Sequence, residues 1–510
     1  MAKERRIDWS SLWKKEDWWA FWLGMLLFIL CLATAYGMDI MGWVVKASTW
    51  VDAGKAMGPT SKAYADLVPQ EYADLVPLGS FIVTWLVLLI LTTIGAAAMG
   101  WKRSRFVAAF TVIFILTWMC WVIGHNAYIA ATDPQKAGVP WSLRMTGEAG
   151  YIFALILGLI IGNFFKGFAN WLKEAAKPEW FIKTAIVLLG AVVGIKAPTI
   201  PPEVLYNYLF RGLCAIVEAY LIYWALVYWV ARRYFGFSRE WAAPLASGIS
   251  ICGVSAAIAT GGAIRARPIV PIMVSSLVIV FAVVELLFLP FLAAGTLHAQ
   301  PLVAGAWMGL AVKTDGAAVA SGELVEALII GHYPEYEPLK GWIVNAAVTT
   351  KIFIDIFIGV WAFILAVVWV YWIERRPGEK VEKLEIWYRF PKFVIGYFLT
   401  FFIVFLLTSA AINAYAASLG VTPLELTKEQ FKASFAPFNA AVGEMDSFRK
   451  IFFALTFFSI GVISDFSTLR REGIGRLALV YFICLFGFII WIGLLISWLF
   501  FHDVHQLFLR

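Results

Sequence analysis

Apolar runs of about 20 residues recur along the whole chain. Of its 510 residues, 61% are hydrophobic and 15% are charged, whereas about a quarter of the residues of a soluble domain are charged. A run of this length crosses the ~30 Å hydrocarbon core of a bilayer as an α-helix. The sequence therefore predicts an all-α, polytopic membrane protein that lacks a separate soluble domain.

We expect about 13 transmembrane helices. They lie near 17–36, 79–101, 103–123, 149–165, 181–197, 204–231, 241–264, 268–293, 301–321, 342–372, 391–417, 451–467 and 476–501. With the N-terminus in the cytoplasm, the basic loops fall inside, as the positive-inside rule requires. Arg265 and Arg267 are the exception if 241–264 crosses the bilayer. Making both 241–264 and 301–321 re-entrant would leave every later loop on its side, so charge alone leaves both topologies open.

The remaining composition argues against several classes of protein. The net charge of +7 comes from basic residues in short loops beside the spans, which indicates membrane topology rather than a nucleic-acid partner. The cysteines have no CxxC spacing, so neither a disulfide framework nor a metal site is predicted. The histidines lie in loops or near the end of the chain, and no GxxxxGK[ST] loop is present. We therefore predict no enzyme activity, no catalytic residue and no cofactor.

The stretch 246–262 (ASGISICGVSAAIATGG) is rich in small and polar residues between apolar spans. Broken backbone survives at membrane depth only where it is buried in protein or lines a wet cavity. A half-helix that begins there directs N–H groups and the positive end of its dipole at an anion, as in secondary transporters. The candidate substrate ligands are Gly248, Ser250, Cys252, Gly253 and Ser255. The alternative is close helix packing through the same small residues.

A second stretch, 307–322 (WMGLAVKTDGAAVASG), places ionisable residues inside an apolar span. A charged side chain at the bilayer centre costs at least about 2.5–3.5 kcal/mol, so it usually faces a partner or a water-filled path. Lys313 and Thr314 are candidates for binding an anionic substrate, and Asp315 is a candidate for carrying a proton or cation. The alternative is a structural ion pair between Lys313 and Asp315.

Further ionisable residues in the spans are candidates for binding the coupling ion. Lys351 and Asp355 share a helix face, and a plain intrahelical pair is favoured over a relay. Glu285 has no basic residue within one turn of it. Arg211 and Glu218 also share a face, two turns apart. The candidates for the coupling ion are Asp315, Glu285, Lys351 and Asp355.

Several motifs resemble the landmarks of the YeiH-type sulfate exporter family, in the order expected for it. They are SGISICGVSAA (247–257), TAIVLLGAVVGIKAPTI (184–200), WMGLAVKTDGAAVASG (307–322), VTTKIFIDIF (348–357) and SIGVISDFSTLRREG (459–473). The resemblance covers about 149–501. It implies a ten-helix core of two inverted five-helix halves, as in the wider group of bile-acid and sodium–proton transporters, and a role in anion export.

The chain departs from this family in two respects. Where the family has a Ser-x-His arrangement with a nearby Gln, this chain has Ala311, Lys313 and Ala317, which indicates a changed substrate or coupling ion. We expect residues 1–148 to form an accessory or dimerisation region of three helices with a long outer loop, and 149–510 to form the transporter core. The outer loop contains YADLVP twice, which favours a surface turn or short helix.

These features lead to the hypothesis of a secondary active transporter for a small anion, namely sulfate, sulfite or an organic sulfonate. Access would alternate around the broken helices. A proton- or sodium-coupled transporter of another organic anion, an ion channel and a membrane sensor are the alternatives. The expected partners are the anion, a proton or sodium ion, and the lipid bilayer of a prokaryotic cell membrane. A homodimer is left open.

Overall fold

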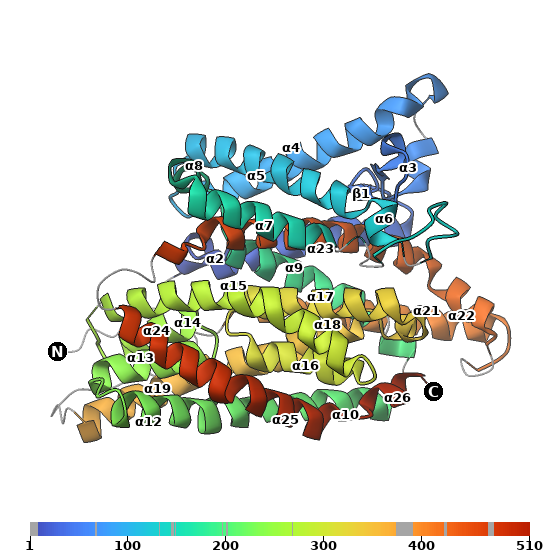
Figure 1. Cartoon of the computed structure of the whole chain (residues 1–510). Coiled ribbons are helices and arrows are strands. Elements are labelled where there is room, and N and C mark those ends of the chain that lie inside the picture. The colour runs from blue at the N-terminus through green and yellow to red at the C-terminus, as the bar shows by residue number, and fades with distance from the viewer. Residues whose placement is uncertain are drawn as a thin grey trace. The chain divides into compact units, whose positions relative to one another are not determined.

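The computed structural model describes residues 9–66, 69–131, 133–143, 147, 149–195, 197–199, 202–267, 269–373, 391–422, 426–467 and 474–509. These residues are helical almost throughout (Figure 1). Among them, eight helices are long and apolar enough to cross a membrane, and one bent helix pair would make nine. The predicted all-α membrane fold is therefore confirmed, whereas the number of 13 spans is not.

The chain forms two compact units. Unit 1 contains Met1–Pro201 and Lys392–Ile463, and unit 2 contains Pro202–Pro391 and Ser464–Arg510. The elements of unit 1 are α1 (Ser11–Lys14), α2 (Glu16–Leu32), η1 (Ala33–Tyr36), β1 (Val45–Ala47), η2 (Ala53–Lys55), β2 (Met57–Pro59), α3 (Lys62–Asp66), η3 (Gln70–Leu75), α4 (Val76–Ala98), α5 (Arg103–Gly124), α6 (Ala127–Ala130), α7 (Ala149–Phe164), α8 (Lys166–Leu172), α9 (Pro178–Gly194), η4 (Ala197–Thr199), α21 (Phe393–Ser418), α22 (Lys428–Ser434) and α23 (Ala436–Ile463).

Continuous helices in close contact make up most of unit 1. Helix α23 packs against α7 and α9, and α21 packs against α9. A Cβ atom added at Gly162 would lie 2.7 Å from the carbonyl oxygen of Gly461, so these glycines let the backbones of α7 and α23 approach closely. The Thr400 hydroxyl joins α21 to α9 by donating to the carbonyl of Val187 (2.6 Å). Helix α23 is longer than the predicted span 451–467 and begins 15 residues earlier.

The N-terminal region lies within unit 1. Helix α2 packs on α9, α21 and α23. The Thr34 hydroxyl donates to Glu444 (3.0 Å), and Thr60 contacts Ser447 (2.8 Å). The compact unit therefore has no boundary at the predicted position 148, and an accessory function for 1–148 stays a prediction. The outer loop adds the antiparallel pair β1–β2. The first YADLVP copy is helical over 64–66, whereas its residues 67 and 68 lie outside the described residues; the second runs from η3 into α4.

Unit 2 contains the candidate site residues. Its elements are α10 (Pro202–Gly212), α11 (Cys214–Val217), the π-helix η5 (Glu218–Tyr223), α12 (Trp224–Arg233), α13 (Arg239–Ser250), α14 (Val254–Ala263), α15 (Ile269–Leu297), α16 (Pro301–Ala311), α17 (Asp315–His332), η6 (Pro334–Leu339), α18 (Trp342–Ile356), α19 (Ile358–Val368), the π-helix η7 (Trp369–Ile373), α24 (Ile474–Cys484), the π-helix η10 (Leu485–Ile489), α25 (Ile490–Phe501) and α26 (Val504–Leu509).

The stretch 239–263 folds as a helical hairpin, which we call hairpin 1. Its first helix, α13, has 12 residues and is about 18 Å long, too short to cross the ~30 Å hydrocarbon core. The chain then returns to its starting end, because Arg267 donates its backbone N–H to the Glu240 carboxylate (2.7 Å). Between the two helices, Thr260 donates a hydrogen bond to Ser247 (2.6 Å).

The stretch 301–332 folds in the same way and forms hairpin 2. His298, just before α16, stacks its ring on that of Tyr333, just after α17, with the ring centroids 4.4 Å apart. Helix α15 runs from the base of hairpin 1 to the base of hairpin 2, so the hairpins enter unit 2 from opposite ends. Figure 1 shows α13 and α14 toward one end of α15, and α16 and α17 toward the other.

The hairpins favour one of the two topologies that charge alone left open. The predicted spans 241–264 and 301–321 each turn back inside unit 2, as re-entrant segments do. Arg265 and Arg267 therefore lie at the same end as Arg239, and the exception to the positive-inside rule disappears. Which end faces the cytoplasm stays a prediction.

Candidate functional site

The tips of the two hairpins meet inside unit 2. Tip 1 comprises residues 251–253, and tip 2 comprises residues 312–314. A Cβ atom added at Gly253 would lie 2.9 Å from the carbonyl oxygen of Lys313 and 3.3 Å from Cγ2 of Thr314. The predicted discontinuities are thus present, and the fold brings them into direct contact.

The backbone turns differently at the two tips. Gly253 has a φ of +64°, a left-handed conformation that costs a residue with a side chain about 1 kcal/mol or more. At tip 2, Val312 and Thr314 are extended. The Thr314 hydroxyl caps α17 by accepting from the N–H of Ala317 (3.2 Å). Asp315 occupies the first turn of α17, where the helix dipole favours a negative charge.

Lys351 on α18 connects the two tips. Its Nζ donates to the carbonyl of Ile251 (2.8 Å) and to that of Val312 (3.5 Å). These carbonyls lie at the C-terminal ends of α13 and α16, where the helix dipoles favour a cation. The same Nζ lies 3.9 Å from Asp315 Oδ1. Lys351 therefore contacts the interrupted ends of both helices. The predicted pairing with Asp355 did not include these contacts.

Cys252, Asp315 and Asp355 gather around this lysine. Each contributes one ligand atom to a group in which all atoms lie within 4.8 Å of one another, and all three residues are buried. The spacing alone would suit a metal ion, and the group could not be recognised in the sequence because its three residues are far apart in the chain. Lys351, however, already supplies a positive charge here, which a metal cation would have to face. We interpret the aspartates as electrostatic partners of Lys351.

Lys313 belongs to a different group of side chains from Asp315. Its Nζ donates to the carbonyl of Leu310 and lies 4.5 Å from the ring centroid of Tyr223, a cation–π contact. Its backbone N–H donates to Glu285 Oε2 (2.9 Å). The predicted alternative of a Lys313–Asp315 pair therefore does not describe the contacts of Lys313, and Glu285 has a basic neighbour that the local sequence did not reveal.

Glu218 is a buried carboxylate outside the predicted set of site residues. It begins the π-helix η5, and π-helices occur frequently at functional sites. Its side chain is 0% exposed and interacts electrostatically with Lys313. Arg211, which the sequence placed on the same face, instead donates to the carbonyl of Phe500 (2.6 Å). An acidic residue alone in the middle of an apolar span was the signal available.

The other predicted substrate ligands have local roles or are buried. Gly248 permits close packing, because a Cβ atom there would lie 2.8 Å from Cγ1 of Val274. Ser250 is fully buried at the end of α13. The side chain of Ser255 lies outside the described residues. Contact of these residues, and of Thr314, with a substrate stays a prediction.

Residues 122–480 match the family described as "Conserved hypothetical protein 698". The chain belongs to this family. The UPF0324 membrane protein NE0724 of Nitrosomonas europaea is 42% identical to it over 497 residues, which are 96% of each chain. The UPF0324 membrane protein RB9488 of Rhodopirellula baltica is 27% identical over 93% of this chain and 88% of that protein.

An uncharacterized protein of Archaeoglobus fulgidus is 85% identical over 187 residues, which are 37% of this chain and all of that protein. No solved structure matches the chain. Membership of the UPF0324 family agrees with the YeiH-type resemblance and with a multi-pass membrane protein. The names of these relatives state no substrate, so the chemistry of the site must indicate it.

Proposed function

We propose that this UPF0324 protein is a secondary active transporter of a small anion and not an enzyme. The meeting of two hairpin tips beside two buried lysines is the observation that carries this proposal. Discontinuous helices whose ends meet within the protein are typical of secondary transporters. Lys313 and Lys351 supply the positive charge that an anion needs, and the resemblance in sequence suggests sulfate, sulfite or an organic sulfonate.

The burial of the site supports alternating access. Lys313 is 0% exposed and Lys351 is 2% exposed, so an anion reaches them only if the surrounding helices separate. The two hairpins enter from opposite ends, and movement of either one would open the tips toward its own end. This arrangement favours a carrier over a permanently open channel.

The charges around the tips favour a coupling ion. Four buried carboxylates, those of Glu218, Glu285, Asp315 and Asp355, accompany only two lysines. An additional anion in this group requires added positive charge, because an uncompensated charge costs several kcal/mol in the protein interior. A bound proton or sodium ion would supply that charge, so we propose coupled transport.

Flux into proteoliposomes tests the function. The purified chain would be reconstituted, and the uptake of labelled sulfate, sulfite and methanesulfonate would be measured separately. We expect saturable uptake of at least one of them. Lys313→Met should lower the initial rate about 10- to 100-fold, because a hydrogen bond to a charged group contributes about 1.5–3 kcal/mol.

Lys340→Met is the matched control, because Lys340 is exposed and pairs with Glu337 (3.3 Å) away from the tips. Its uptake rate should equal that of the wild type. An unchanged rate in Lys313→Met would remove the site assignment. Flux that does not saturate would favour a channel, and the absence of flux for all three anions would reject this substrate class.

A further inference from the structure

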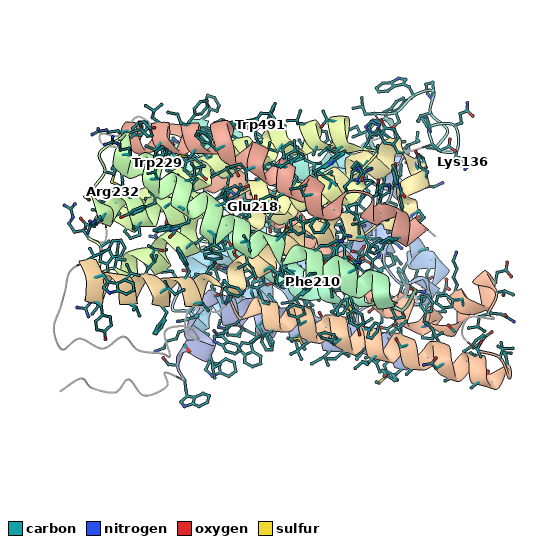
Figure 2. All side chains as sticks on the ribbon, turned by 90° about the horizontal axis from the view of Figure 1, so that it is seen from below. Lys136, Phe210, Glu218, Trp229, Arg232 and Trp491 are labelled. Atoms are coloured by element: carbon teal, nitrogen blue, oxygen red, sulfur yellow. The ribbon has the colours of Figure 1, made fainter. Side chains whose placement is uncertain are left out.

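Glu218 lies deep in unit 2, far from either end of its helical span. Figure 2 shows it between Phe210 and Arg232, which lie toward opposite ends of the span. That span, Tyr206–Arg233, is one of those long enough to cross a membrane. Within the described part of the chain, neither oxygen of Glu218 accepts a hydrogen bond of good geometry, and the hydroxyl of Tyr223 is the hydrogen-bonding group beside it. A bare, ionised carboxylate in such a place is unfavourable by several kcal/mol.

The neighbouring tyrosine indicates how Glu218 can be satisfied. The Tyr223 hydroxyl lies beside Glu218, since a Cβ atom at Gly493 would be 2.7 Å from that hydroxyl and 3.4 Å from Glu218 Oε1. Tyr223 donates its only hydroxyl proton to the carbonyl of Ile489 (2.7 Å). While that proton stays on the carbonyl of Ile489, the hydroxyl offers Glu218 only an acceptor, which a protonated carboxyl group can use. An ionised Glu218 would instead have to take the hydroxyl proton away from Ile489.

Glu285 approaches the same lysine from another helix. Its Oε2 accepts from the backbone N–H of Lys313, whereas its Oε1 has no partner among the described residues. Lys313 interacts electrostatically with both glutamates. Two buried carboxyl groups thus share one ammonium group, and the group of three is neutral only when one carboxyl group is protonated.

We propose that Glu218, Glu285 and Lys313 form a proton-binding site whose loading prepares Lys313 for an anion, so that the anion and the proton cross the membrane together. This inference rests on the proposed function. With one carboxyl group protonated, the remaining carboxylate neutralises Lys313. A second proton neutralises that carboxylate and leaves the charge of Lys313 for the substrate. One proton then accompanies each monovalent anion, and the loaded site stays neutral.

Other ionisable groups also face this site and set the conditions of the test. Cys214 and Tyr223 lie near Glu218, Tyr481 faces Glu285, and Lys351 lies near both Glu285 and Lys313. Lys351 donates to the tip carbonyls rather than to either glutamate. The two glutamates are therefore the groups whose protonation changes the charge around Lys313.

Movement of the anion with a proton has a direction that can be measured. In a cell that keeps its exterior more acidic than its interior, such coupling drives the anion inward. An exporter, as the resemblance to sulfate exporters implies, would instead need exchange against the proton. The two couplings predict opposite responses to the same pH gradient.

Proteoliposomes with an acidic exterior separate these outcomes. Labelled sulfite, sulfate or methanesulfonate, whichever gives saturable flux, should accumulate inside above its equilibrium level. Glu218→Gln mimics the protonated carboxyl, so exchange of internal for external anion should continue while accumulation of the anion falls to equilibrium.

Glu326→Gln is the control, because Glu326 is a buried carboxylate whose Oε2 accepts from the N–H groups of Gly341 and Val344. Proteoliposomes with this variant should still accumulate the anion. Efflux driven by the acidic exterior, or accumulation unchanged in Glu218→Gln, would overturn the inference.

A second measurement does not depend on finding the substrate. Infrared difference spectra of the purified protein at neutral and alkaline pH should contain the band of a protonated carboxyl group, and Glu218→Gln should remove it. Tyr223→Phe keeps the ring over Lys313 but removes the hydroxyl group beside Glu218, so the frequency of this band should shift while the band itself remains. A band without anion flux would retain the proton site and reject the proposed function. Flux without the band would retain the transporter and reject the proton site.

Discussion

Hairpin 1 turns at Ile251, Cys252 and Gly253, and hairpin 2 turns at Val312, Lys313 and Thr314. The first tip contributes a backbone carbonyl to Lys351 and turns on a left-handed glycine. The second contributes an ammonium group and a threonine cap on α17. The two tips thus meet at one place with different chemistry. Hairpin 1 contributes the shape of its backbone, and hairpin 2 contributes a charged side chain.

The largest effect is expected at the lysine that both hairpins share. Lys351→Met removes the donor to both tip carbonyls and leaves Asp315 without the ammonium group 3.9 Å away. Breaking a buried ion pair on one side costs about 3–5 kcal/mol. We expect this loss in the free energy of unfolding measured in detergent, together with loss of anion flux.

A double substitution distinguishes the charge from the side-chain packing. Asp315→Asn in the Lys351→Met background removes the uncompensated carboxylate, so it should restore a large part of the stability but none of the flux. If the double variant is no more stable than Lys351→Met, the Lys351–Asp315 interaction does not stabilise the contact between the two tips.

A smaller effect, confined to the shape of hairpin 1, is expected for Gly253→Ala. The φ of +64° strains any side chain, and the new Cβ would lie 2.5 Å from Cγ1 of Val278 and 2.9 Å from the carbonyl of Lys313. We expect a decrease of about 1–3 kcal/mol in the free energy of unfolding. Gly295→Ala is the control, because nothing lies within 4 Å of its Cβ position; it should be neutral or slightly stabilising. Equal effects of the two substitutions would contradict the role of Gly253 in the turn.

The two breaks were predictable from the sequence, whereas the path of the chain through them was not. Glycine and serine in 246–262, and charges in 307–322, mark places where a plain membrane helix is unfavourable. The return of each hairpin depends on contacts between residues far apart, such as Glu240 with Arg267 and His298 with Tyr333. Every later basic loop keeps its side whether the two stretches cross or form hairpins, and only the loop with Arg265 and Arg267 changes side, so charge alone did not choose between them.

The ionisable residues show the same limit. Spacing along one helix suggested that Lys351 pairs with Asp355, but its ammonium group donates to the carbonyls of Ile251 and Val312, which are 100 and 39 residues away. Glu218 was visible as an acidic residue in an apolar span. Its importance follows from Tyr223, whose hydroxyl proton is committed to a carbonyl 266 residues away. The local sequence identifies an ionisable residue that is unfavourable inside an apolar span, and only the tertiary fold identifies its neighbours.

The smallest effects are expected at the bases of the hairpins, where the two differ again. Hydrogen bonds from Arg267 lower the pKa of Glu240 below its ordinary value of 4.5, at an exposed ion pair whose Nε–Oε1 distance is 3.0 Å. Because the pKa is lower in the folded chain, the pair stabilises hairpin 1 fully above about pH 4.5, and its contribution disappears as the pH falls through the folded-state value. Glu240→Gln should therefore lower the melting temperature slightly at neutral pH and low salt. In acid or in high salt, the melting temperatures of the variant and the wild type should become equal.

The base of hairpin 2 is an aromatic stack of His298 on Tyr333, so at neutral pH the decrease in melting temperature caused by His298→Ala should not depend on salt. If salt changes the decrease in melting temperature equally for both variants, the two bases are held together by the same kind of interaction.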